Sequence, residues 1–89
     1  MVRITFTSNL QKHLPCASMD VAGETVREVL EGVFAANPRL RSYLLDDQQR
    51  LRRHVNVYVD DRPVADRLRL ADPVAPGSRL YVFQMLTGG

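Results

Sequence analysis

The sequence of 89 residues has no tryptophan, a single cysteine and no long apolar run. One cysteine, Cys16, excludes the internal disulfides that stabilise many small secreted domains. No stretch approaches the roughly 20 apolar residues that span a bilayer, and the alternating N-terminus lacks the unbroken apolar core of a signal peptide. These absences predict a small cytoplasmic protein with no membrane partner.

A strong excess of one charge is also absent, because 12 lysines and arginines face 10 aspartates and glutamates. The densest basic cluster, Arg50, Arg52 and Arg53, comes shortly after Asp46 and Asp47 and contains no aromatic residue that could stack on a base. We therefore expect a solvated loop of mixed charge and no nucleic-acid partner. Arginine, which suits carboxylate contacts at partner surfaces, dominates the basic residues, but coding bias explains this equally well.

Residues that could carry catalysis or bind a metal do not form a recognisable set. Cys16 is more typical of a buried or inert thiol than of a nucleophile, and His13 and His54 lack the spacing of a zinc site. The pairs Asp46-Asp47 and Asp60-Asp61 fit turns, where acidic side chains make local hydrogen bonds. A chain of this length has room for one core but not for a deep substrate cavity, so we expect a protein that is not an enzyme and binds no metal or cofactor.

The first half of the chain predicts two strands and a helix. Val2 to Thr7 has the period of two of a half-buried strand, and Leu14 to Val21 repeats it more weakly as an edge strand. The spacing of Thr25 and Glu28 is that of a capping box, so a helix should begin at Thr25 and end at Asn37-Pro38. Its apolar stripe consists of Val26, Val29, Leu30, Val33 and Phe34.

The second half predicts a short helical turn, a loop and three further strands. A turn of helix is expected at Leu40–Leu44, a polar loop at Asp46–Arg53 and a strand at His54–Val59, with Val55, Val57 and Val59 facing the core. After a turn at Asp60-Asp61, an edge strand should start at Pro63-Val64. A loop then places single apolar anchors in the core, namely Leu68, Leu70 and Val74. The last strand, Arg79 to Met85, follows a turn at Pro76-Gly77 and directs Leu80 and Val82 inward.

One amphipathic helix needs one sheet face to bury its stripe, so the element order predicts a two-layer α+β domain. We expect a mixed sheet of four to five strands packed on one main helix, with the first and last strands paired at its centre. This is the β-grasp, or ubiquitin-like, arrangement. Residues 1–86 should form the domain and residues 87–89 a flexible tail.

The tail ends in Gly88-Gly89, which stabilises neither a helix nor a strand. Without Cβ atoms, the pair can enter a narrow channel of another protein and present a free carboxylate there. Such an end also arises by chance or as a linker remnant, but its place directly after the last strand of a predicted β-grasp domain strengthens the functional interpretation.

Three segments resemble the ThiS/MoaD family of ubiquitin-like sulfur carriers. They are the strand and turn at His54–Asp61, the turn and strand at Pro76–Val82, and Gly88-Gly89. The longer loop after the helix looks closest to the cysteine-biosynthesis-type carriers. In many members one or two prolines and V-A precede the Gly-Gly end, and Gln84–Thr87 take the place of that stretch here.

The resemblance implies that an E1-like enzyme uses ATP to adenylate the carboxylate of Gly89, while Gly88 provides clearance. Sulfur then displaces AMP, and the thiocarboxylate donates its sulfur to a biosynthetic enzyme. ATP is consumed by the activating enzyme, and the carrier itself is a co-substrate.

A second candidate site is the face of the last strand that points away from the helix. It carries Tyr81, Phe83 and Met85, which Tyr58 joins across the sheet, and it leads into Leu86 and Thr87. Aromatic residues there suit a surface for docking partner enzymes, although loops that cover them would explain them equally well.

Three alternatives to a freely exchanging sulfur carrier stay open at this stage. The chain could be the small subunit of molybdopterin synthase, a β-grasp binding module with an unactivated tail, or a modifier that is conjugated to protein lysines through Gly89. The sulfur acceptor is not identified by the sequence.

Overall fold

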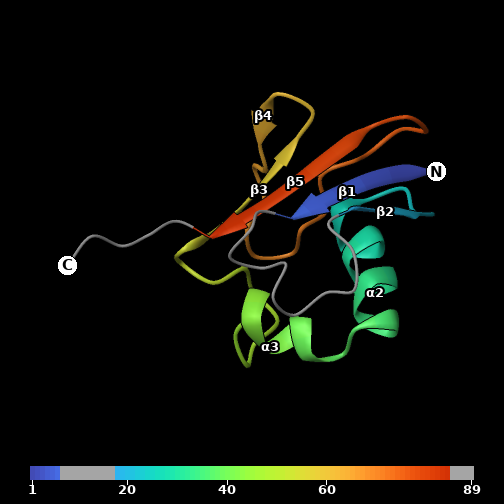
Figure 1. The fold of residues 1–89 in the computed structure, drawn as a ribbon. Helices are drawn as coiled ribbons and strands as arrows, with labels where there is room; N and C mark the ends of the chain where they lie inside the picture. Colours follow the sequence, from blue (N-terminus) through green and yellow to red (C-terminus); the bar gives the residue numbers. More distant parts are fainter. Residues whose placement is uncertain (7–17, 85–89) are drawn as a thin grey trace.

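The computed structural model describes residues 1–6 and 18–84, and the statements below concern these residues (Figure 1). In chain order they form β1 (Val2–Phe6), β2 (Ser18–Val21), α2 (Val26–Ala36), α3 (Arg39–Leu44), β3 (Val55–Val59), β4 (Arg62–Pro63) and β5 (Arg79–Gln84). Of the predicted second strand, residues 14–17 lie outside the described residues, as does Met85 at the end of the last predicted strand.

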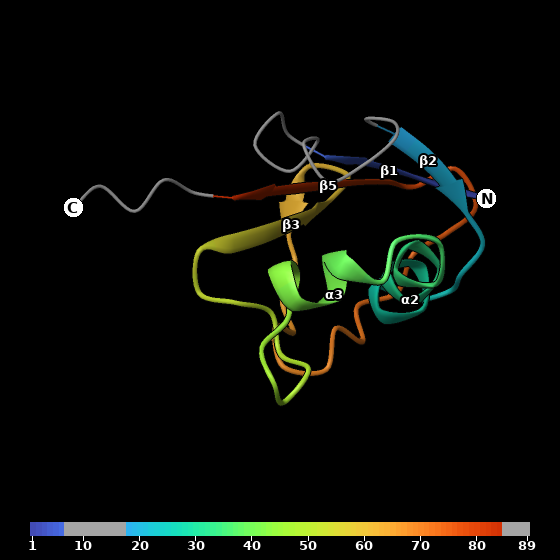
Figure 2. The same cartoon turned by 60° about the horizontal axis from the view of Figure 1, so that its bottom comes forward.

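The strands form one mixed sheet in the order β2-β1-β5-β3-β4. β5 is central and runs parallel to β1 and antiparallel to β3, so the first and last strands are neighbours as predicted. Both helices lie on the same face of the sheet (Figure 2). The predicted α+β class and β-grasp arrangement are therefore confirmed.

The core lies between the helices and the inner face of the sheet. Ile4, Val57 and Val82 are completely buried there, which is the face that the alternation predicted. The whole predicted stripe of α2 is buried against them. The third predicted core residue of β3, Val59, is only partly buried and packs at the edge of this core.

Side-chain capping determines where α2 begins. Oγ1 of Thr25 accepts a hydrogen bond from the backbone N–H of Glu28 at 3.2 Å, so Thr25 is the N-cap and the helix itself starts at Val26. The carboxylate of Glu28 accepts from the N–H of Glu24 at 3.3 Å, whereas a standard capping box would use the N–H of the cap residue itself. The predicted helix start is thus correct to within one residue.

The loop before β5 contains one error of the sequence analysis. Leu70 is fully buried and Val74 packs against the core, but Leu68 is 63% exposed and is not an anchor. The carboxylate of Asp66 accepts hydrogen bonds from the N–H groups of Leu68 and Arg69, at 3.1 and 2.9 Å. This tight turn directs Leu68 to solvent, and hydrophobic spacing does not reveal it.

Gly32 allows α2 to pack closely on β2. A Cβ atom added to Gly32 would lie 2.5 Å from Cγ1 of Val21, well inside contact distance. Val21 is β-branched and nearly buried, so its side chain has little freedom to move away. The glycine that weakens an isolated helix is therefore required by the packing of this one.

Gly32→Ala is expected to lower the free energy of unfolding by about 1–3 kcal/mol, because the new methyl group overlaps Val21. In a Val21→Ala background the overlap disappears, and the same change should be neutral or stabilise by up to about 1 kcal/mol through helix propensity. Urea denaturation of the four proteins measures both effects. Equal destabilisation in the two backgrounds would contradict the close contact.

Candidate functional site

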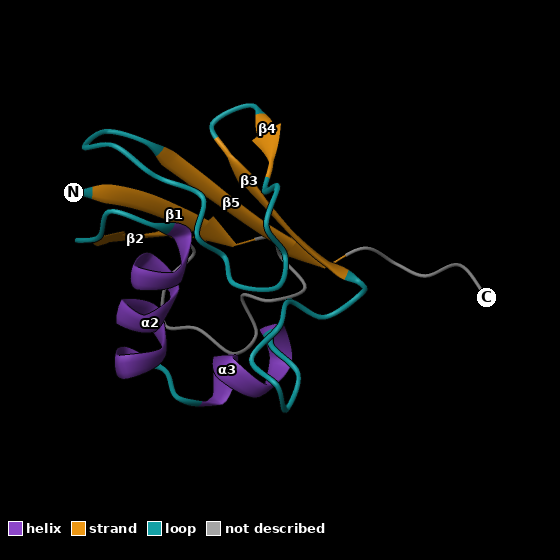
Figure 3. Ribbon diagram, turned by 180° about the vertical axis from the view of Figure 1, so that it is seen from behind, coloured by secondary structure: helices purple, strands orange, loops and turns teal. Residues whose placement is uncertain are grey.

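The central strand β5 ends with Gln84 at one end of the sheet. Gln84, the last described residue, pairs with Val55 at the start of β3. The view from behind shows the end of β5 beside the start of β3 (Figure 3). The predicted site residues Gly88 and Gly89, and the predicted docking residues Met85, Leu86 and Thr87, lie outside the described residues. What the structure provides is the place from which they extend.

Three predicted docking residues come together on the outer face of the sheet, and we call Tyr58, Tyr81 and Phe83 the aromatic patch. Tyr58 is directly opposite Tyr81 in the β3–β5 ladder, and its ring centroid lies 5.4 Å from that of Phe83 at an interplanar angle of 48°. Tyr81 is 40% exposed, while the other two rings are half-buried. The patch therefore presents one accessible ring supported by two partly covered ones.

Arg67, which the sequence analysis did not select, stabilises the turn that leads into β3. Its guanidinium donates hydrogen bonds of 2.7 Å to Oδ1 of Asn56 and to the carbonyl oxygens of Arg52 and Val55. The same residue's carbonyl accepts the N–H of Leu51. Because Val55 pairs with Gln84, Arg67 also stabilises the surroundings of the point where β5 ends.

Two further arginines attach the loops to the helices. Arg27 donates to the carbonyl oxygens of Gln49 and Arg69, at 2.7 and 3.1 Å. Arg41 pairs with Glu31 and lies 4.8 Å above the ring of Phe34. The hydrogen bond from Arg41 lowers the pKa of Glu31 below its usual range. These contacts order the segment that surrounds the start of β3.

The acidic residues of the loops also have structural roles. Oδ1 of Asp46 accepts the backbone N–H groups of Gln48 and Arg50, at 2.9 Å each, and Oδ2 accepts Nε of Arg50 at 3.1 Å. The pKa of Asp46 is lowered chiefly by the hydrogen bond from the N–H of Arg50. This agrees with the interpretation of Asp46 as a turn residue.

The described part of the chain has neither a cluster of metal ligands nor a helix that could span a membrane. Within residues 1–6 and 18–84 no group of three or more histidine, cysteine, aspartate or glutamate side chains could hold a metal ion. None of the helices in these ranges is long and apolar enough to cross a membrane.

The model of the ThiS family matches residues 13–89. The chain belongs to the ThiS family. Members of this family are small protein carriers and not enzymes, and the resemblance to ubiquitin-like sulfur carriers that the sequence indicated is confirmed.

The solved structures agree with this assignment. A chain of the BexX/CysO complex of Amycolatopsis orientalis has a TM-score of 0.87 and 26% identity over 100% of both chains. SAMP1 of Haloferax volcanii has a TM-score of 0.81 and 26% identity, covering 99% of this chain and 98% of its own. CysO of Mycobacterium tuberculosis has a TM-score of 0.85 and 25% identity, covering 97% of this chain and 100% of its own. The curated protein sequences contain no significant match.

The hydrogen bonds at Asp46 predict an acid-dependent loss of stability. The pKa of Asp46 in the folded chain lies below the value of about 3.9 expected for an unfolded chain, so its contribution to the free energy of unfolding is complete above that value. This stabilisation is lost as the pH falls through the lower, folded-state pKa. Asp46→Asn should therefore destabilise the chain at pH 7 and flatten the decline of its melting temperature below about pH 4.

The matched control is Asp47→Asn, because the carboxylate of Asp47 accepts no hydrogen bond among the described residues. It should leave both the stability and the pH profile close to those of the unaltered chain. Melting curves that respond equally to the two substitutions would contradict the assigned role of Asp46.

Proposed function

We propose that this ThiS-family chain is a sulfur carrier that is charged at Gly89 by an ATP-dependent, E1-like enzyme and then delivers sulfur to a biosynthetic enzyme. The observation that supports this most strongly is the position of Gly88-Gly89, five residues or fewer beyond the central strand of a β-grasp domain. The carrier needs no catalytic set of its own, because the reaction takes place in the active site of its partner.

The chemistry requires only the carboxylate of Gly89 from this chain. A carboxylate oxygen attacks the α-phosphorus of ATP, an acyl–phosphate anhydride forms, and pyrophosphate leaves. Hydrosulfide then attacks the acyl carbon and expels AMP, which leaves a thiocarboxylate and a proton. Gly88 has no Cβ atom, so it can pass through a narrow channel without steric conflict.

Chain length determines which surface the partner must contact. Residues 85–89 span at most about 18 Å when fully extended. An enzyme that holds Gly89 in its active site therefore lies against the end of β5, next to the aromatic patch. Aromatic rings are frequent anchors of protein interfaces, so this patch is a suitable docking surface.

Conjugation to other proteins is a second candidate. It is supported by the likeness to SAMP1 of Haloferax volcanii, which is a small archaeal modifier protein. In this case the lysine amine of a target protein, and not hydrosulfide, attacks the activated carbonyl of Gly89.

Incubation with the activating enzyme, MgATP and sulfide tests the proposal. The intact mass is expected to rise by the difference between sulfur and oxygen, and a chain without Gly88-Gly89 should stay unchanged. If the E1-like enzyme of the same organism, shown to be active, leaves this chain unaltered, the proposed sulfur transport is excluded. A Gly89 isopeptide on lysine in tryptic peptides would favour the conjugation alternative.

Tyr81→Ser is expected to raise the KM of the activating enzyme for the carrier about tenfold, because it removes the accessible ring of the docking surface. Tyr81→Phe keeps the apolar ring and should change KM less than twofold. Steady-state adenylation assays measure both variants, with circular dichroism as the check of folding. An unchanged KM for Tyr81→Ser would show that the aromatic patch is not the docking surface.

A further inference from the structure

Cationic side chains gather beside the end of β5. A pocket of about 470 Å³ is lined by four arginines and one histidine, together with a single carboxylate, that of Asp46. We call the five basic residues of this pocket the basic rim: Arg50, Arg52, Arg53, His54 and Arg67. The rim joins the basic cluster of the sequence with Arg67, which comes from the loop that follows β4.

Most of the positive charge on the rim is not neutralised. Arg50 pairs with Asp46 at 3.1 Å. The guanidinium groups of Arg52 and Arg67 donate to neutral oxygen atoms, such as the carbonyl of Ser42 at 2.9 Å. Carbonyl and amide oxygens fix a guanidinium in place but do not cancel its charge. Arg53 is exposed and has neither a hydrogen bond nor a carboxylate partner among the described residues.

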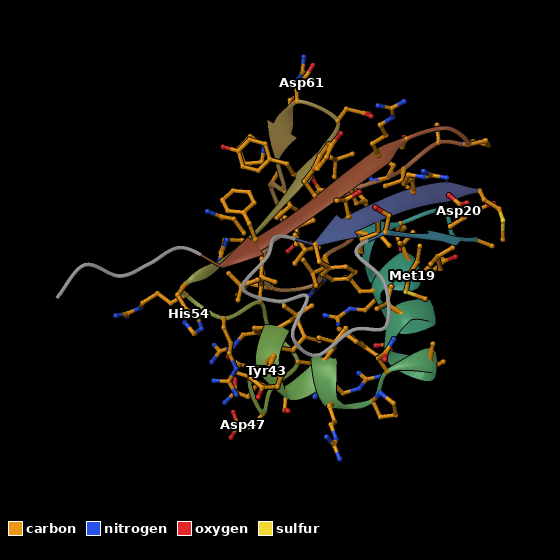
Figure 4. The ribbon with its side chains drawn as sticks, viewed as in Figure 1. Met19, Asp20, Tyr43, Asp47, His54 and Asp61 are labelled. Atoms are coloured by element: carbon orange, nitrogen blue, oxygen red, sulfur yellow. The ribbon has the colours of Figure 1, made fainter. Side chains whose placement is uncertain are left out.

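The rim lies where a partner must approach. Val55, which follows His54, is in register with Gln84, and Figure 4 shows His54 near this end of the sheet. Asp61 lies at the opposite end, in the turn between β3 and β4. Charge is therefore distributed unevenly along β3: the basic rim lies at the end near Gln84, whereas Asp60 and Asp61 outnumber Arg62 at the opposite end.

We propose that the basic rim binds an acidic surface that surrounds the entrance for the tail on the activating enzyme. This inference rests on the proposed function, since the tail determines which surface faces the enzyme. Arginines held in place by carbonyl oxygens are prepared for carboxylate contacts, and complementary charge accelerates association. A nucleic acid is disfavoured because the pocket lining contains no phenylalanine, tyrosine or tryptophan side chain that could stack on a base.

Two charge reversals at opposite ends of β3 test the proposal. Arg53 precedes the strand and Arg62 follows it, and both side chains are exposed. Arg53→Glu should raise the KM of adenylation at least about tenfold at low ionic strength, with kcat unchanged, whereas Arg62→Glu should change it less than twofold. The effect of Arg53→Glu should shrink as salt rises from about 0.1 M to about 1 M, because the Debye length falls from about 10 Å to about 3 Å.

The affinity of the purified E1-like enzyme of the same organism is also measured without ATP, so that docking is separated from charging. If Arg53→Glu weakens binding to the enzyme, docking through the basic rim is supported. If the wild-type chain binds in the same way but is never charged, docking is still supported and sulfur transport is excluded. Equal effects of the two reversals, no effect of Arg53→Glu, or no binding of the wild-type chain would overturn the proposal. Binding of the wild-type chain and of Arg53→Glu to polyuridylate is measured in parallel. If Arg53→Glu abolishes this binding and leaves the KM of adenylation unchanged, the rim is a nucleic-acid site and the proposal is overturned.

Discussion

The parallel ladder between β1 and β5 joins the first and last strands of the described fold. It is flanked by β2 on one side and by β3 on the other. Its register is set by buried pairs such as Ile4 opposite Leu80 and Phe6 opposite Val82. A shift by one residue would move these side chains to the outer face and bury Tyr81 in their place. The same ladder therefore determines the core, the aromatic patch and the position at which the chain leaves the sheet.

Under the proposed function, this constraint explains how so small a chain can serve a complex reaction. The domain supplies the base, and the reacting atoms belong to the C-terminal glycine, which a partner enzyme receives. Arginines contribute to this base more than any other polar residue type, since Arg27, Arg41 and Arg67 each bind oxygen atoms from distant segments. Arg27 and Arg41 also pair with Glu31, whereas Arg67 donates to neutral oxygen atoms and keeps its charge. Under the proposed docking, a structural and a binding role therefore coincide at Arg67.

Local patterns predicted most of the fold, because a period of two or of 3.6 residues depends only on near neighbours. The stripe of α2 and the N-cap at Thr25 were visible in this way. The pairing of the first and last strands was inferred from the continuous apolar character of both. The side-chain contacts between distant segments were not visible. Nothing near Arg67 in the sequence indicates its bonds to Asn56 and Val55, and no periodicity reveals that Gly32 faces Val21. Leu68 was misplaced because a turn built on Asp66 overrides its hydrophobicity.

The candidate site also has features that the sequence reveals and features that only the structure reveals. Gly88-Gly89 and the alternating aromatic residues Tyr81 and Phe83 lie close together in the chain, so the sequence displays them directly. The basic rim requires residues 50–54 and Arg67 to meet across a folded loop, so only the structure shows it.

The most direct test of the account is the chemical state of the C-terminal residue in chain isolated from sulfur-replete cells. An alkylating agent such as iodoacetamide reacts with a thiocarboxylate sulfur and not with a carboxylate, and mass spectrometry of the C-terminal peptide locates the product. The account predicts alkylation at Gly89 that disappears when the activating enzyme is deleted. A C-terminal peptide that is never alkylated, although the activating enzyme is present and active, would contradict it.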